Sequence, residues 1–246
     1  MRWLWSAVGL SLFLFAWEGL ARSGLLAAHL LPAPSSVPRA LYSEWTNDIW
    51  LQMLWGSFSH YSVGLTIGST LGVLVGIVIA MSPRIEALQN WAMRLLRPIP
   101  PLAWAPFAII WFGVTETAAA FIISIGVFWI NYFSAFTAVR SVDKDLIEVA
   151  HDFGHGNLFA RLRKVILPAA MPGILSGLRT GLGQGWMTVV AAELLGVSGI
   201  GQRMTEAAGL LASDVVVLYM LTIGALYALT DALFVAVQNR LLAWQK

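Results

Sequence analysis

The sequence contains no cysteine and few charged residues. The absence of cysteine excludes a disulfide framework, thiolate catalysis and a Cys-ligated metal site. Charged residues make up only 11% of the 246 residues, and hydrophobic residues make up 58%. Soluble domains carry roughly 25% charged residues, so this composition indicates one integral membrane domain. The net charge of +2 is too small to argue for nucleic-acid binding. The motif G-x-x-x-x-G-K-[ST] is also missing, so the chain cannot cradle nucleotide phosphates by that device.

Apolar segments set the expected fold, because a helix needs about 20 apolar residues to cross a membrane. Six segments stand out, the third of them interrupted by prolines, at 3–21, 62–81, 100–113, 117–139, 172–195 and 215–238. We therefore expect an all-α membrane protein with about six transmembrane helices. For the first segment a cleavable signal peptide is the alternative, although Trp17 and Glu18 fit a cleavage region poorly.

Positive charges indicate the orientation of these helices. With a cytoplasmic N-terminus, the inner segments hold Arg2, Arg84, Arg94, Arg97, Arg140, Lys144, Arg161, Arg163, Lys164, Arg240 and Lys246. The outer segments hold only Arg22, Arg39 and Arg203. Lysine and arginine collect on the cytoplasmic side of membrane proteins. We therefore expect both termini to be cytoplasmic.

Residues 30–61 differ from the rest of the chain. They begin with the proline-rich stretch LLPAPSSVPRAL, which predicts an extended entry. Trp45, Leu54, Trp55 and Phe58 then suggest an interfacial helix on the outer face, with lipid-surface packing or ligand binding as its use. This divides the chain into an N-terminal part, 1–61, and a core transmembrane domain, 62–240.

Two glycine ladders run along the second and fifth apolar segments. A glycine at every fourth position forms a flat stripe that lets another helix approach closely, inside the subunit or across a dimer. A glycine-lined translocation path is the alternative. The ladders are Gly64, Gly68, Gly72 and Gly76, and then Gly173, Gly177, Gly181 and Gly185.

A charged insert at 141–168 separates the fourth and fifth apolar segments. Its charges cannot face lipid, so the insert lies in water, on the cytoplasmic side by the charge rule. Apolar residues at helical spacing predict two short amphipathic helices, separated by Gly154 and Gly156, and Pro168 is expected to end the second. Such a helix pair offers a docking surface, and a helix lying on lipid is the alternative.

Catalytic and metal sites are not indicated. His151 and His155 could share a helix face as metal ligands, but no third ligand lies nearby, which favours a solvated face. No Ser-His-Asp or paired-carboxylate arrangement converges in the apolar segments.

Polar side chains and proline-broken backbone within the apolar segments predict a solute path. Arg179 could reach the inner surface, and Glu193 lies near the outer end of the fifth segment, where it could form a gate or accept backbone hydrogen bonds. Asp231 in the last segment is equally ambiguous. Proline-broken backbone is tolerated at membrane depth only beside protein or a water-filled cavity. The candidate path or gate residues are Pro101, Trp104, Arg179, Gln184, Trp186 and Glu193.

The insert resembles the EAA loop of ABC-importer permeases. Glu148-Val149-Ala150, Gly154 six residues after the glutamate, and the run Val165 to Pro168 carry this resemblance. The segments 97–113, 167–186 and 190–201 are similar to the branch that handles taurine, aliphatic sulfonates and nitrate. The similarity covers about residues 31–240. Two departures stand out: Val149 replaces the middle alanine, and the stretch from Gly154 to Pro168 is one residue longer than the pattern.

The resemblance implies a type I ABC-importer-like permease fold with cytoplasmic coupling helices in a bacterial inner membrane. It implies as partners two copies of a cytoplasmic ATPase subunit, a second permease copy in a homodimer, and an extracytoplasmic solute-binding protein. ATP and Mg²⁺ would bind to the ATPase, so this chain itself would be no enzyme and would bind no cofactor. The implied ATPase-coupling residues are Glu148, Val149, Ala150, Gly154, Arg161, Val165, Leu167 and Pro168.

Two other functions remain open from the residues alone. An ion-coupled secondary transporter would use Arg179, Glu193 and Asp231 to carry coupling charge, and a membrane scaffold would transport nothing. For an importer, Arg179 and the resemblance favour a small anion such as a sulfonate or nitrate.

Overall fold

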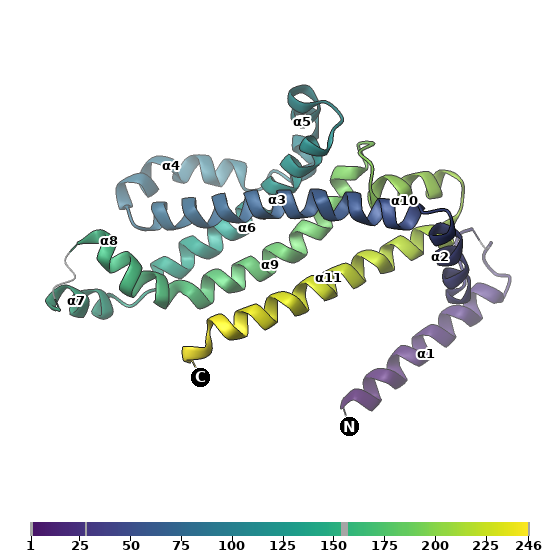
Figure 1. Ribbon diagram of the computed structural model, residues 1–246, viewed down its shortest axis with the longest axis horizontal. Coiled ribbons are helices and arrows are strands. Elements are labelled where there is room, and N and C mark those ends of the chain that lie inside the picture. The colour runs from purple at the N-terminus through teal and green to yellow at the C-terminus, as the bar shows by residue number, and fades with distance from the viewer. Residues whose placement is uncertain (1, 28, 154–156, 246) are drawn as a thin grey trace. The chain divides into compact units, whose positions relative to one another are not determined.

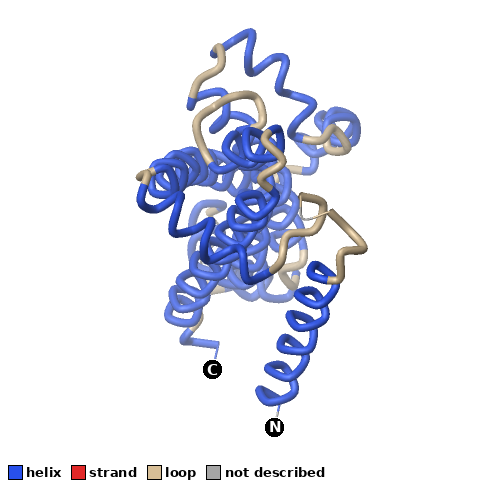
Figure 2. The backbone as a smooth tube through the Cα atoms, turned by 90° about the vertical axis from the view of Figure 1, so that its right-hand side faces the viewer, coloured by secondary structure: helices blue, strands red, loops and turns tan. Residues whose placement is uncertain are grey.

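The computed structural model describes residues 2–27, 29–153 and 157–245. All regular secondary structure in these residues is helical (Figures 1 and 2). The helices are α1 Arg2–Arg22, α2 Val37–Thr46, α3 Ile49–Ala80, α4 Pro83–Leu96, α5 Ala105–Phe112, α6 Glu116–Arg140, α7 Lys144–Asp152, α8 Leu158–Arg161, α9 Leu167–Glu193, α10 Ile200–Gly209 and α11 Ser213–Leu241. Short 3-10 turns lie at Pro34–Ser36, Pro101–Trp104 and Ala243–Gln245, and a π turn lies at Leu162–Ile166.

Five helical stretches within the described residues are long and apolar enough to cross a membrane. They contain α1, α3, α6, α9 and α11. A sixth crossing is obtained if α4 and the segment Pro101–Phe112, which bend by 93° at their junction, are counted as one broken span. The expected all-α membrane fold with about six crossings is thus confirmed.

The chain forms two compact units, and α3 and α11 each contribute to both. One unit consists of Met1–Phe58 and Ser198–Leu226, and the other of Ser59–Val197 and Tyr227–Lys246. The 61/62 boundary expected from the sequence falls inside α3.

The larger unit is built around α6, against which both glycine ladders pack. In the first ladder, a Cβ added at Gly72 would lie 2.6 Å from the carbonyl oxygen of Phe128, and one at Gly76 would lie 2.5 Å from that of Tyr132. Real side-chain carbons do not approach so closely, so only glycine lets α3 lie directly on the α6 backbone. Figure 1 shows α3, α6 and α9 running alongside one another in this unit.

The second ladder, on α9, packs against a neighbouring face of α6, and Asn131 lies in contact distance of both ladders. Cβ atoms added at Gly173 and Gly181 would lie 2.7 Å from the Cβ of Ala138 and 2.9 Å from Nδ2 of Asn131. Gly177 meets Ser134 in the same row, and Gly185 meets the ring of Tyr61 on α3. Both ladders therefore allow tight helix packing inside the subunit, which is the interpretation that we preferred to a glycine-lined translocation path.

The predicted proline-broken third span, 100–113, is shorter than expected. The α-helical part, α5, has only eight residues, which is too few to cross a membrane alone. The preceding residues, which we expected to form a loop, instead form α4. Ser82 accepts a hydrogen bond from the Ile85 amide and Pro83 occupies the first turn, two helix-start signals that the apolar pattern concealed.

The second span begins earlier than expected. The structure breaks at Asn47–Asp48, where Asp48 has a positive φ of 57°, and residues 49–80 then form one helix. The separate interfacial helix predicted to run through Phe58 was therefore wrong. Polar residues such as Ser57 and His60 hid the start of the span, but both have partners inside the protein: Ser57 accepts the Ile200 amide hydrogen, and His60 contacts Glu193. These partners offset part of the cost of burying the Ser57 hydroxyl and the His60 ring.

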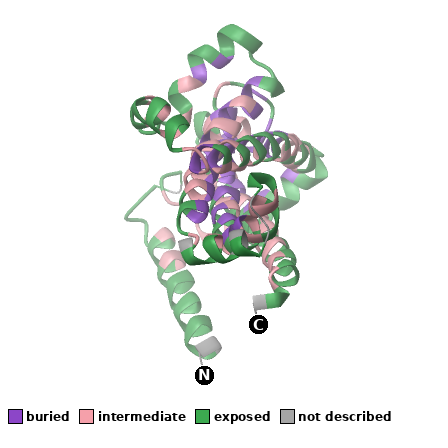
Figure 3. Cartoon of the chain, turned by 90° about the vertical axis from the view of Figure 1, so that its left-hand side faces the viewer, coloured by how far each residue is buried: buried purple, intermediate pink, exposed green. Residues whose placement is uncertain are grey.

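In the smaller unit, a buried carboxylate connects α2, α10 and α11. Glu44, only 4% exposed, accepts hydrogen bonds from Arg203 at 2.6 and 3.1 Å and from the Tyr219 hydroxyl at 2.8 Å. By contrast, α1 is largely exposed along its length (Figure 3). Its Glu18 accepts the Ser35 amide hydrogen at 3.0 Å and pairs with Arg22.

Candidate functional site

The segment 141–168 forms two short helices, as predicted, and each has its own start signal. The Asp143 carboxylate accepts the Asp145 amide hydrogen at 3.0 Å at the start of α7, and the Asn157 side chain accepts the Phe159 amide hydrogen at 3.1 Å at the start of α8. These caps satisfy amides that a helix start leaves unpaired. The helices are therefore locally specified rather than imposed by packing alone.

One side of this segment is anchored to the core of the larger unit. The core here consists of small and branched side chains of α3, α6 and α9, including Ala135, Val139 and Ile174. Ile147 of α7 and Leu162 of the π turn pack against it. These contacts fix the segment to the ends of the spanning helices.

The other side of the segment exposes large apolar residues. Leu146 and Val149 are 50% and 51% exposed, and Phe153, just after α7, is 80% exposed. Leu158 and Phe159 of α8 are exposed as well. We call these five residues the apolar tip. Their exposure next to many charges is typical of a surface that is covered by a partner.

The predicted coupling residues fall on both sides of this segment. Glu148 is exposed beside Val149 on α7, while Leu167 is half-buried against the core. Arg161 is half-buried, and within the described residues its Nε makes no hydrogen bond. Ala150 belongs to α7 but its side chain is not described, and Gly154 lies outside the described residues. The same holds for the side chain of His151 and for His155.

Pro168 does not end a helix, contrary to the sequence prediction. Helical structure runs without interruption from Leu158 to Glu193, and Pro168 occupies the first turn of α9. The reason is the π turn before it, in which the Leu167 amide donates to the Leu162 carbonyl. Proline lacks an amide hydrogen, so a helix tolerates it best where the regular ladder is already shifted. Val165, half-buried, lies within this turn.

The π turn also bears on the additional residue between Gly154 and Pro168. A π turn closes its hydrogen bond over one more residue than an α turn does. It thereby absorbs one inserted residue without rotating the helix that follows. The register of α9 after Pro168 can accordingly match that of a chain with a shorter loop.

Arg179 of α9 forms a bidentate ion pair with Asp231 of α11. The Arg179 Nε lies 2.6 Å from Asp231 Oδ1, and Nη2 lies 2.8 Å from Oδ2. The Arg179 side chain is 48% exposed although both residues lie within spanning helices. Charged groups at such positions face a water-filled cavity or a protein partner rather than lipid.

A groove lined by small and hydroxyl residues lies on α6 and α9. Its polar lining comes from Ser134 and Thr137 of α6, from Ser141 directly after α6, and from Ser176 and Thr180 of α9. Ser176 and Thr180 flank Arg179 in the sequence. Hydroxyl groups and a nearby guanidinium are suitable hydrogen-bond donors for a small oxyanion.

Two further predicted path residues meet where the 3-10 turn Pro101–Trp104 contacts α6 and α9. A Cβ added at Gly126 would lie 3.1 Å from Pro101 and 2.8 Å from the Thr188 hydroxyl. Gln184 donates to that hydroxyl at 3.3 Å. Trp104 is half-buried in the same turn, and within the described residues its indole nitrogen has no hydrogen-bond partner. The structure thus brings Pro101 and Gln184 together around Thr188.

Trp186 and Glu193 are buried in this conformation. The Trp186 ring stacks on Tyr61 at 4.2 Å between centroids and donates to the Thr230 hydroxyl at 3.2 Å. Glu193 is 0% exposed and its Oε1 lies 3.0 Å from the His60 Nδ1. This partner of Glu193 could not be predicted, because His60 lies 133 positions away in an apolar run.

The Glu44–Arg203 pair was also missed. Burial alone raises the pKa of Glu44, but hydrogen bonds from Arg203 and Tyr219 and the charge of Arg203 outweigh it and hold the pKa below the ordinary value. Hydrogen bonding to Glu44 raises the pKa of Arg203 further, against the effect of burial. The available signals were two acids in residues 30–61, Glu44 and Asp48, and three outer arginines, and nothing in the sequence pairs Glu44 with Arg203.

Comparisons with known proteins agree with these features. Residues 68–243 match the family described as binding-protein-dependent transport system inner membrane component. The chain is 33% identical to the taurine transport system permease protein of Escherichia coli, over 99% of this chain and 94% of that protein. It is 31% identical to a putative aliphatic sulfonates transport permease protein of Bacillus subtilis, over 93% and 83%. A bicarbonate transport system permease protein of Synechococcus elongatus is 30% identical, over 89% and 82%.

Solved structures show the same fold. The chain matches the methionine ABC transporter MetNI in an inward-facing conformation with a TM-score of 0.65 and 19% identity, over 80% of this chain and 96% of that one. An amino acid ABC transporter solved with histidines matches with a TM-score of 0.57, 18% identity, and 80% and 94% coverage. The expected type I importer-like permease fold is thus confirmed. The extent of the family match establishes that the chain belongs to the binding-protein-dependent transport system inner membrane components.

Proposed function

We propose that α7 and α8 are the elements through which a partner ATPase drives this permease. Members of the family are permease subunits of ABC importers and are not enzymes, since a partner subunit hydrolyses ATP. The similar permeases whose names state a solute are those for taurine, aliphatic sulfonates and bicarbonate. The solutes of this chain are of that type, small and oxygen-rich. ATP and Mg²⁺ would bind to the ATPase.

The exposed apolar tip is the observation that carries the coupling proposal. Phe153, directly after α7, is 80% exposed, while Ile147 within α7 is packed against the core. A surface of this kind is stabilised when a partner covers it, and motion of the partner then reaches the spanning helices through the anchored side. Glu148 and Arg161 would add polar contacts.

The solute path is proposed to run near the Arg179–Asp231 pair and the hydroxyl groove. Both involve α9, and the charged residues of the pair lie within spanning helices, where charges face protein or water rather than lipid. Arg179 would offer a small oxyanion its guanidinium. Trp186 and Glu193 are buried, so as gate residues they would reach the path only in another conformation, which alternating access would supply.

The proposed assembly contains two ATPase subunits, a second copy of this chain and an extracytoplasmic solute-binding protein. Both termini and the apolar tip would face the cytoplasm of a bacterial inner membrane. No nucleic acid takes part.

The test uses the complete complex in proteoliposomes. Phe153→Ala and Glu148→Arg should each reduce solute-stimulated ATP hydrolysis and uptake by about tenfold, because hot-spot contacts contribute roughly 1–3 kcal/mol. Phe13→Ala, which removes an equally large exposed ring from α1, is the matched control and should leave both rates unchanged. Wild-type rates in both test variants would refute the coupling role.

An ion-coupled secondary transporter is the second candidate, favoured only by the charge pair of Arg179 and Asp231. It predicts uptake by this chain alone that collapses with the ion gradient. Uptake that requires the ATPase and the binding protein would exclude it.

A further inference from the structure

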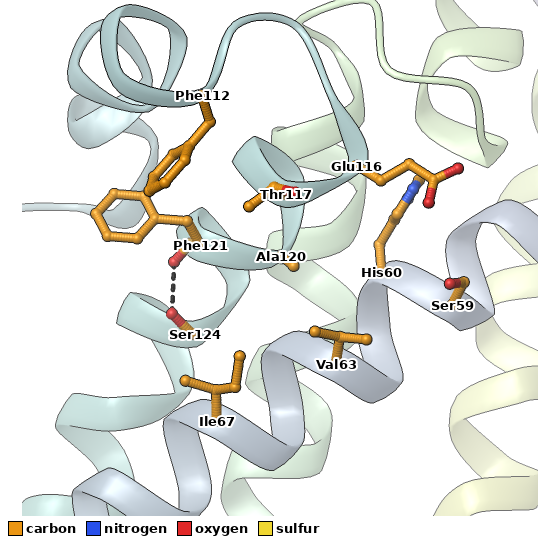
Figure 4. Close-up of a pocket in the computed structure, with 10 residues that line it drawn as sticks. All are labelled: Ser59, His60, Val63, Ile67, Phe112, Glu116, Thr117, Ala120, Phe121 and Ser124. Carbon is orange, nitrogen blue, oxygen red and sulfur yellow. Dashed lines mark hydrogen bonds between the residues drawn. The ribbon is translucent and has the colours of Figure 1, made fainter.

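A cavity of about 320 Å³ lies between α3 and the start of α6, closed on one side by Phe112 at the end of α5. Figure 4 shows its polar end, where His60 and Glu116 point toward one another. His60 is 2% exposed, whereas Glu116, the first residue of α6, is exposed at the rim. The cavity therefore has a buried polar end that is reached past an accessible carboxylate.

His60 offers an unused hydrogen-bonding atom to this cavity. Its Nδ1 lies 3.0 Å from Glu193, but its Nε2 is buried and has no hydrogen-bond partner among the described residues. Buried polar atoms are almost always hydrogen-bonded, so an unpartnered one that lines a cavity indicates a ligand atom. When Nδ1 donates to Glu193, Nε2 of the neutral ring is an acceptor.

The charges around the cavity favour a positively charged ligand. Glu116 lines it, and Glu193 lies behind His60. The hydroxyl groups of Ser59 and Thr117 can accept hydrogen bonds. An anion would meet net repulsion here, whereas an ammonium group would find acceptors.

The remaining lining indicates an organic cation rather than a metal ion. Phe112 and Phe121 line the cavity with ring centroids 5.4 Å apart, and aromatic faces attract ammonium groups. Val63 and Ile67 add an apolar wall. No group of three or more acidic, histidine or cysteine side chains in the described residues could hold a metal ion.

We propose that this cavity binds a small organic cation whose ammonium group lies between the Glu116 carboxylate and the faces of Phe112 and Phe121, and whose hydroxyl or N–H group donates a hydrogen bond to the His60 Nε2. The proposal is independent of ATPase coupling and of the transported solute. The ammonium group can belong to a free molecule or to a phospholipid headgroup, since Glu116 begins a spanning helix and so lies at the membrane boundary.

Choline binding to the purified protein in detergent tests the proposal by isothermal titration calorimetry. The neutral isostere 3,3-dimethylbutan-1-ol should bind at least about tenfold more weakly, because it keeps the shape but lacks the charge. Propanesulfonate should not bind at this cavity. Equal binding of the isostere, or tighter binding of the sulfonate, would overturn the proposal.

Variants locate the site. Glu116→Gln should weaken choline binding about tenfold, and Phe121→Leu about threefold to tenfold, as expected for one ion pair and one cation–π contact. The matched control is Glu206→Gln, an exposed carboxylate on α10, which should leave binding unchanged. Because Glu116 is exposed, its variant is expected to fold, and circular dichroism checks this. An unaltered affinity in the folded Glu116→Gln variant would count against the site.

The lipid source is tested in nanodiscs. If the headgroup is the ligand, phosphatidylethanolamine nanodiscs should suppress choline binding to wild type, whereas phosphatidylglycerol nanodiscs should not. Strong binding in both would support a free cation. Absence of choline binding in detergent and in phosphatidylglycerol nanodiscs would refute the ammonium site altogether.

Discussion

The contact of Gly72 with α6 allows a quantitative test of the packing. In Gly72→Ala, the new Cβ would lie 2.6 Å from the Phe128 carbonyl oxygen and 3.0 Å from the Asn131 Cβ. Comfortable contacts are about 3.5 Å or longer, so the two helices must separate by roughly 1 Å. Overpacking of this kind costs about 1–3 kcal/mol.

A matched control isolates this cost from helix propensity. Alanine is favoured over glycine inside a helix by about 1 kcal/mol, whatever the surroundings. Gly224 on α11 has open space around it, with no atom within 4 Å of an added Cβ. Gly224→Ala should therefore be neutral or stabilising. The difference between the two variants then measures overpacking alone, about 1–3 kcal/mol.

The free energy of unfolding is measured by titrating the purified protein in mixed micelles with sodium dodecyl sulfate and following circular dichroism. Gly72→Ala should unfold at the lower detergent fraction. If the free energies of unfolding of Gly72→Ala and Gly224→Ala lie within about 0.5 kcal/mol of each other, α3 does not approach the α6 backbone as closely as described.

Three further changes probe other contacts. Arg179→Gln and Asp231→Asn should each destabilise the protein, and a double-mutant cycle should show that the double variant is less destabilised than the sum of the two single variants. Trp186→Phe keeps a ring against Tyr61 but loses the hydrogen bond to Thr230, and should lower the free energy of unfolding by about 1 kcal/mol. Because the pKa of Glu44 is lowered, its ionised form stabilises the fold above the unfolded-state value of about 4.3, and this stabilisation is lost as pH falls through the lower folded-state value. The thermal midpoints of wild type and Glu44→Gln should therefore converge below about pH 4 and separate above it.

The sequence predicted correctly those helices that are specified by an uninterrupted local run of apolar residues. The limits of α6 and α11 agree with the apolar segments to within a few residues, because few polar positions interrupt them. The glycine ladders predicted close helix approach correctly. Their common partner, α6, could not be read from the ladders, since a stripe of glycines does not specify which helix covers it.

The errors have physical causes. The start of α3 was hidden because Ser57 and His60 look costly in a span until their distant partners are known. Pro168 looked like a helix end because a π turn leaves no simple periodic signal. Pairs such as Glu44 with Arg203 join residues 159 positions apart, and sequence patterns do not report such contacts.

The uninterrupted helix from Leu158 to Glu193 has a mechanical consequence. Its 36 residues span roughly 54 Å, and the contact of Gly177 with Ser134 lies near the midpoint. If that contact serves as a fulcrum, the arms on its two sides are roughly 28 Å and 24 Å long. A sideways displacement of the Leu158 end would then reappear at the Glu193 end with similar size and opposite direction, reduced only by bending at the π turn and at Pro172.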